Sequence, residues 1–189
     1  IKLPYSSGFG SGEGKDFGLE VHQALEKILL DKAKPEDFRD QVQMAVKNGL
    51  SSLKDLENKF PGLEVEDTEV HVNIPLNSIT KYEHDDLTLD GKIDVLFKHN
   101  SGYLLVDWKT DKRDDSASEH KRQLSVYKKM YSISANIPED KITTCVIFVA
   151  LRGGVNIGKF DWSTHIGDKD AQVFKTFDAH LQTVLEWRK

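Results

Sequence analysis

Hydrophobic residues recur every three to four positions in the first part of the chain, which is the spacing of an amphipathic helix. The first stripe starts at Phe17, where Asp16 is suited to cap the helix. It follows a glycine- and serine-rich stretch, 1–16, that predicts a flexible N-terminal segment. A second stripe follows Pro35, a residue that can open a helix. Gly49 is expected to interrupt this stripe, and a third, short helix to follow it.

Further along the chain, apolar and polar residues alternate with the period of a β-strand. Three strands are predicted in succession, over residues 64–76, 87–99 and 101–110. Helical spacing then returns, and a nearly unbroken apolar run after it indicates a strand buried on both faces. These later elements are predicted as a helix over 114–132, strands over 141–151 and 154–160, and a closing helix from about Lys169.

This order of elements predicts the α/β class, with a central mixed β-sheet flanked by helices. A chain of 189 residues is long enough for one domain with its own core. We therefore expect a single domain over 1–189, in which residues 17–132 carry the motifs described below. Residues 133–189 would supply the closing strands and the C-terminal helix.

The composition is that of an ordinary globular protein, with 38% hydrophobic and 30% charged residues. No apolar run is long enough to span a bilayer, and the chain does not open on a signal peptide, so we expect no membrane association. A single cysteine, Cys145, excludes an internal disulfide and predicts a reducing, cytoplasmic setting. The net charge of −5 argues weakly against bulk electrostatic binding of nucleic acid, although acids gathered around a divalent cation would contribute to it.

The stretch "LLVDWKT" ends an apolar strand with an acid and a base. Because successive strand side chains point to opposite faces, Asp107 and Lys109 share one face and Trp108 takes the other. The ordinary alternative is an ion pair exposed to solvent at the end of a strand.

A turn near Asn100 allows a register to be predicted for the strands on either side of it. A two-residue or a four-residue loop gives the same pairing, which places Asp94 directly opposite Asp107 unless a β-bulge intervenes. Two carboxylates so placed repel each other and suit a hard divalent cation such as Mg²⁺ or Mn²⁺. The alternative is that acids and lysines neutralise one another on a solvated face.

Three further polar residues lie on helical stripes. His22 is at the edge of the first stripe, one turn after Gly18, and by itself is more often a core histidine than a metal ligand. Gln123 and Tyr127 are four residues apart and share a helix face, where a polar helix edge is the simpler explanation.

Together these stretches resemble the RecB-like branch of the PD-(D/E)XK nuclease superfamily. The matching motifs, in order, are "GLEVH" (18–22), "GKIDV" (91–95), "VDWKT" (106–110) and "QLSVY" (123–127). The resemblance implies a PD-(D/E)XK restriction-endonuclease-like fold. It also implies that Lys109 assists the attacking water and that Gln123 and Tyr127 complete the site. The metal ligands that it implies are His22, Asp94, Asp107 and the backbone carbonyl of Trp108.

The function implied by the resemblance is a Mg²⁺- or Mn²⁺-dependent nuclease that acts on DNA, as an exonuclease on single strands or DNA ends. Many relatives carry a four-cysteine iron–sulfur cluster, which a chain with only Cys145 cannot form. Others are the C-terminal part of helicase–nuclease chains, and a chain that opens on Ile1 is compatible with an excised domain. A helicase module is therefore an expected partner.

The expected contacts to nucleic acid lie on the helix that carries the last motif. Lys121, Arg122 and Lys129 are the candidates, and Arg122 and Lys129 share one face because they are seven residues apart. A solvated helix surface explains them equally well. Two other functions remain open, which are a catalytically inactive scaffold that binds nucleic acid and a metal-dependent hydrolase of nucleotides or other phosphoesters.

Overall fold

The computed structural model describes residues 12–80, 86–153 and 158–168. Its centre is a five-stranded sheet in which the strands follow one another in sequence order. Only β3 and β4 are parallel, and the other neighbours are antiparallel. This confirms the predicted mixed sheet flanked by helices. The strands are β1 (Glu64–Pro75), β2 (Thr88–His99), β3 (Gly102–Lys109), β4 (Ile142–Leu151) and β5 (Asp161–Ile166).

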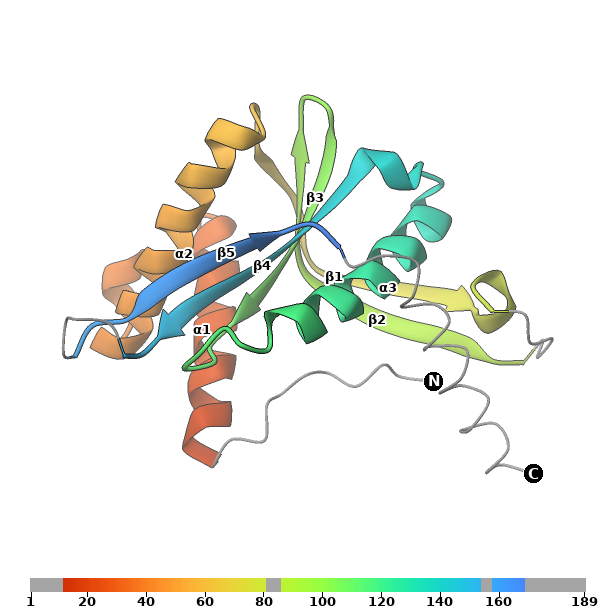
Figure 1. The fold of residues 1–189 in the computed structure, drawn as a ribbon. Coiled ribbons are helices and arrows are strands. Elements are labelled where there is room, and N and C mark those ends of the chain that lie inside the picture. The colour runs from red at the N-terminus through yellow and green to blue at the C-terminus, as the bar shows by residue number, and fades with distance from the viewer. Residues whose placement is uncertain (1–11, 81–85, 154–157, 169–189) are drawn as a thin grey trace.

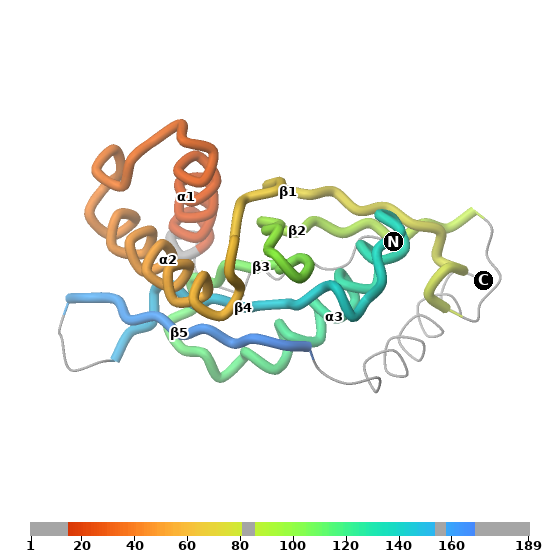
Figure 2. Tube along the Cα trace, turned by 90° about the horizontal axis from the view of Figure 1, so that it is seen from above, coloured from red at the N-terminus to blue at the C-terminus, as the bar shows by residue number. Residues whose placement is uncertain are grey.

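Helices cover both faces of this sheet (Figures 1 and 2). The helices α1 (Gly12–Leu29) and α2 (Asp40–Lys59) pack on one face, and α3 (Ala117–Ala135) packs on the other. α3 connects the parallel strands β3 and β4, which need such a crossover. Short 3-10 turns lie at Pro35–Asp37, Leu76–Ser78 and Glu139–Lys141. None of the helices in the described ranges has the length and apolar character needed to cross a membrane.

Two hydrophobic clusters fill the space between the sheet and its helices. The first joins α1 and α2 to alternate residues of the central strands, with Val95, Val106 and Trp108 among them. The second joins α3 to the opposite face of the same strands, where Leu96 and Leu105 lie. The candidate site described below lies at the middle strands β2 and β3, between these two layers.

The second helix differs from the sequence prediction. α2 runs from Asp40 to Lys59 without a break, so the predicted interruption at Gly49 is wrong. A Cβ atom on Gly49 would lie 3.0 Å from a methyl group of Leu25 and 3.5 Å from the ring of Trp108. The missing side chain therefore lets α2 approach α1 and β3, and tertiary packing outweighs the low helix propensity of glycine.

Other boundaries also shift. α1 starts at Gly12, five residues before the predicted Phe17. The short strand predicted over 154–160 is wrong in its described part, because residues 158–160 form no strand and β5 begins at Asp161. The helix predicted from about Lys169 lies outside the described residues.

We predict that the Cys145 thiol is unreactive in the folded protein. Cys145 is fully buried on β4, and burial raises the pKa of its thiol to about 12. An aromatic disulfide reagent at neutral pH should therefore label one thiol per chain in denaturant and none under native conditions. Full labelling of the folded protein would contradict this packing of β4.

Candidate functional site

The acid and base at the end of β3 are buried and touch each other. Asp107 and Lys109 lie on the face toward α3, each about 8% exposed, and Trp108 packs on the other face with α1 and α2. The Lys109 Nζ atom is 2.7 Å from Oδ2 of Asp107. The alternation predicted for this strand is confirmed, and the alternative of a solvent-exposed ion pair is wrong.

Asp94 on β2 lies beside this pair, but not as a simple cross-strand partner. The predicted register is confirmed from Val95, opposite Val106, to the two-residue turn. The described ladder ends there, one residue before Asp94 would face Asp107. Instead, the Trp108 N–H donates to Oδ2 of Asp94 at 2.8 Å. The carboxylate has thus replaced a backbone acceptor, and it joins β2 to β3 where their pairing stops.

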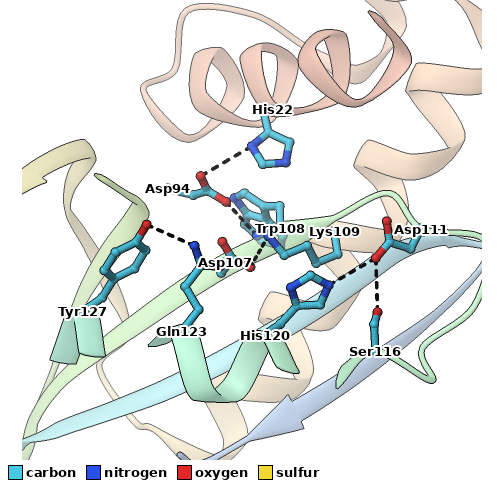
Figure 3. Close-up of polar contacts among 10 residues, drawn as sticks. All are labelled: His22, Asp94, Asp107, Trp108, Lys109, Asp111, Ser116, His120, Gln123 and Tyr127. Atoms are coloured by element: carbon cyan, nitrogen blue, oxygen red, sulfur yellow. Dashed lines mark hydrogen bonds and ion pairs between the residues drawn. The ribbon is translucent and has the colours of Figure 1, made fainter. Parts of the chain in front are cut away.

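His22 approaches Asp94 from α1 (Figure 3). Its Nδ1 is 3.4 Å from Oδ1 of Asp94. Gly18 lies one turn earlier on the same helix, where a Cβ atom would be 3.0 Å from Oγ1 of Thr110, just after β3. The glycine therefore lets α1 come close to the end of β3, which brings His22 to the acids.

The opposite wall of the site comes from α3, as Figure 3 shows. Gln123 donates from Nε2 to the Tyr127 hydroxyl oxygen at 3.2 Å, and Tyr127 is 4% exposed. A Cβ atom on Gly91 of β2 would lie 2.7 Å from the Tyr127 ring. The glycine of the "GKIDV" stretch thus makes room for the tyrosine.

Charge and burial act against each other at every group in this cluster. Burial opposes ionisation of Asp94, but His22, Lys109 and the Trp108 amide outweigh it and hold the pKa of Asp94 below its usual range. Burial raises the pKa of Asp107, Lys109 opposes the rise, and the Asp94 charge adds to it. Burial disfavours the charged forms of His22 and Lys109, yet the neighbouring carboxylates raise both pKa values. The pKa of each group in the cluster therefore depends on the charges of its neighbours as well as on burial.

The chemistry of these groups fits a hard divalent cation. Two carboxylates and an imidazole are the ligand types that Mn²⁺ accepts, and Mg²⁺ prefers the carboxylates. Two buried atoms, Nδ1 of His22 and Oδ2 of Asp107, have no hydrogen bond of good geometry. Within the described ranges no three acidic, histidine or cysteine side chains form a ready metal-binding group. Asp107 instead contacts Lys109, and Asp94 contacts the Trp108 amide and His22.

The three cations expected to bind nucleic acid have different surroundings. The Lys121 ammonium donates to the backbone oxygen of Ile166 at 3.0 Å, and Lys129 pairs with Glu139. Arg122 is exposed on α3. The first two side chains therefore fasten α3 to its neighbours.

A polar cluster that was not predicted from the sequence fixes the loop between β3 and α3. Asp111 accepts hydrogen bonds from Oγ of Ser116 at 3.3 Å and from the ring of His120 at 3.2 Å. A second pair, His165 of β5 with Asp114 at 3.1 Å, fixes the same loop. His120 is three residues before Gln123 on α3, and this helical spacing was the available signal.

Comparisons with known proteins place the chain in a family. The family model described as the PD-(D/E)XK nuclease superfamily matches residues 6–186. Among solved structures, the one described as "Crystal structure of SSO0001" is similar, with a TM-score of 0.39 and 12% identity. The similarity covers 86% of this chain and 74% of that chain. No curated protein matches the chain in sequence.

We predict that Asp111 contributes stability at neutral pH that acid removes. The His120 hydrogen bond, against the effect of burial, holds the pKa of Asp111 below its usual range. A folded-state pKa below the unfolded value gives stability that is present above the unfolded pKa and lost as the pH falls. The destabilisation caused by Asp111→Asn should therefore shrink between neutral pH and about pH 3.

Denaturant unfolding over this pH range would measure the effect. The matched control is Asp115→Asn, because Asp115 is an exposed acid in the same loop whose contact is a surface ion pair with Arg113. It should change the free energy of unfolding little at any pH. A loss from Asp111→Asn that is the same at every pH would contradict the prediction.

Proposed function

This chain belongs to the PD-(D/E)XK nuclease superfamily, and we propose that it is a divalent-metal-dependent nuclease that hydrolyses phosphodiester bonds of DNA. The observation that carries the proposal is the buried contact between Asp107 and Lys109, beside Asp94 and His22. A buried ion pair contributes little net stability, because desolvation offsets its attraction. A catalytically inactive scaffold would have no use for such a pair, and this favours an enzyme.

His22, Asp94 and Asp107, with the backbone carbonyl of Trp108, would hold a Mg²⁺ or Mn²⁺ ion. Such an ion supplies Lewis acidity toward a phosphate oxygen when it is bound. Asp94 is prepared for this role because the Trp108 amide fixes one of its oxygens, and the other lies 3.4 Å from Nδ1 of His22. Asp107 would become a ligand of the ion by giving up its contact with Lys109.

Lys109 then acts on the substrate. Its ammonium, released from Asp107, lies on the same strand face and donates to the phosphate, where it stabilises the negative charge that develops during attack by water. Lys109 also orients that water, because its three donors can contact the water and the phosphate together. As a cation it does not compete for the metal-ligand positions.

Gln123 and Tyr127 close the site from the side of α3. Burial and the nearby Asp107 charge raise the pKa of Tyr127, so its phenol stays neutral. Since the phenol oxygen accepts from Gln123, its hydrogen is directed elsewhere and can donate to a phosphate oxygen. The pair therefore positions the substrate.

We propose single-stranded DNA or a DNA end as the substrate, cleaved exonucleolytically. The side chains of Asp94 and Asp107 are only 5% and 12% exposed, so the scissile phosphate must reach a largely buried pair of acids. A flexible strand can do so more easily than a stiff duplex. Arg122, which is exposed on α3, would contact its backbone, and Lys121 and Lys129 would assist by exchanging their present partners. A helicase module, on the same or an associated intracellular chain, would supply such strands.

Replacing either acid should abolish cleavage. Asp107→Asn and Asp94→Asn keep the shape of each side chain but remove a charged metal ligand, so activity should fall by at least about a hundredfold. The assay compares labelled single- and double-stranded DNA with Mg²⁺, Mn²⁺ or EDTA. Calorimetric titration with Mn²⁺ should show weaker binding by both variants.

The control for these variants is Asp55→Asn, an exposed acid on α2. It should cleave like the parent. Full activity of either site variant with Mn²⁺ would place the catalytic metal elsewhere, and EDTA-resistant cleavage by the parent would exclude a metal-dependent reaction.

Lys109→Ala should separate catalysis from metal binding. Turnover should fall by about a hundredfold, the usual effect of losing one charge-stabilising group, whereas Mn²⁺ affinity stays the same or rises as Asp107 is released. Lys109→Arg should not restore turnover, because the larger guanidinium does not fit a site that is 8% exposed.

Single-turnover kinetics at saturating metal would measure this effect, with Lys47→Ala on the exposed face of α2 as the control. A Lys109→Ala protein that turns over at the parental rate would leave the pair with a structural role only.

A further inference from the structure

Asp94 interrupts an otherwise regular strand. All residues of β2 from Thr88 to Lys98 except Asp94 pair with β1, and the described pairing with β3 stops at Val95. In a regular strand alternate side chains point to the same face, yet Ile93 packs with α3 whereas Val95 packs with α1 and α2. The pleat of β2 therefore changes at Asp94.

The residue that faces this break from β1 is Glu69. The neighbouring pairs of the ladder are Thr68 with Val95 and Val70 with Ile93. This register brings Glu69 opposite Asp94, although the two form no pair in the described ladder. Glu69 also has a φ of 52°, in the left-handed region that residues other than glycine adopt only at a cost in free energy. Two irregular residues thus oppose each other across the same two strands.

An ion pair holds the Glu69 side chain. Its Oε2 contacts Nζ of Lys92, and the two side chains are 32% and 27% exposed. Lys92 lies two residues before Asp94 on β2, so the ion pair joins the strands diagonally beside the break. A partly buried pair is screened less than an exposed one, and this contact therefore helps to offset the backbone strain.

Because of the break, the Asp94 carboxylate makes contacts that it could not make from a regular strand. One oxygen is 3.4 Å from His22 on α1, and the other accepts the Trp108 amide of β3 at 2.8 Å. A side chain in an unbroken ladder would point to one face, and the backbone would satisfy the amides of the neighbouring strand. The irregularity is thus what turns Asp94 toward both groups.

We propose that Glu69, held by Lys92, is a positioning residue that sets Asp94 for binding the divalent cation. Its left-handed backbone keeps Asp94 out of the ladder, with the carboxylate turned to His22 and Trp108. Glu69 acts through Asp94 alone and touches no reacting group. The inference rests on the proposed function, because that function makes Asp94 a metal ligand.

Two substitutions at Glu69 test the backbone directly, because both remove the ion pair. Glu69→Gly accepts the left-handed conformation readily, whereas the β-branched side chain of Glu69→Val disfavours it strongly. The Val variant should bind Mn²⁺ about tenfold more weakly, as is typical when a residue that supports a ligand is lost. The Gly variant should stay within about twofold of the parent, since it keeps the required backbone.

The second readout needs neither metal nor substrate. Amide hydrogen exchange of the metal-free protein, followed by NMR, reports whether the Trp108 N–H still donates to Asp94. It should be faster in Glu69→Val by about tenfold or more and close to the parent in Glu69→Gly. Calorimetric titration with Mn²⁺ gives the affinities.

Glu64→Gly is the matched control. Glu64 is an exposed residue of the same strand that pairs with Lys98 and has no positive φ. A glycine there should lower the Tm because it weakens the strand, but it should leave Mn²⁺ affinity unchanged. Glu69→Gly should lower the Tm less, since it relieves strain. Comparing Glu64→Gly with Glu69→Val distinguishes the effect of a weakened strand from the effect of a misplaced Asp94.

Unchanged Mn²⁺ affinity and unchanged Trp108 exchange in Glu69→Val would overturn the inference. If that variant does not fold, Lys92→Met takes its place, because it removes the contact that holds Glu69. Unchanged Mn²⁺ affinity and unchanged Trp108 exchange in Lys92→Met would then overturn the inference. If the parent itself binds no Mn²⁺, the proposed function has failed, and Trp108 exchange alone then decides whether Glu69 positions Asp94.

Discussion

The rest of this structure depends on one constraint, which is that ionisable side chains are buried next to one another at the centre of the sheet. Asp94, Asp107 and Lys109 are buried together with the half-buried His22 beside them, and a buried charge left without its partner would cost several kcal/mol. The partners come from α1, β2 and β3, with α3 as the opposite wall. If the helices on one face moved away from the sheet, a charged group would be exposed or would lose its partner. The geometry of the site therefore depends on the packing of both faces of the sheet.

Glycines allow the helices to come close enough for this arrangement. Gly18 lets α1 reach the end of β3, Gly49 lets α2 pack against Trp108, and Gly91 accommodates the Tyr127 ring. Each lies at a crossing of two elements rather than in a turn. The glycines of the first two motifs therefore have a packing role, and the polar residues that follow them in sequence are carried to the site by those close approaches.

Local rules predicted the parts of the site that depend on neighbouring residues. The faces of Asp107 and Lys109 follow from strand alternation, and the hairpin register follows from a two-residue turn. The sequence could not show that the pleat breaks at Asp94, because Glu69, the residue with positive φ that faces the break, lies on another strand. The contact of Asp111 with His120 likewise depends on how a loop folds back onto α3. These two features were missed because residues distant in sequence decide the conformation.

The break at Asp94 also shows why the site sits in the middle of the sheet rather than at an edge. The backbone of a regular central strand forms hydrogen bonds with both neighbouring strands, and its side chains alternate between the two helix layers. The side chain of one residue therefore does not contact both a neighbouring strand's backbone and the opposite layer. At Asp94 the side chain accepts the Trp108 amide, which compensates for a ladder contact, and the same carboxylate faces His22 in the other layer. The Asp94 carboxylate, which is a proposed metal ligand, thus replaces a hydrogen bond that the backbone lost at the break. An apolar residue at this position could not accept the Trp108 amide, and it would remove the link between the layers.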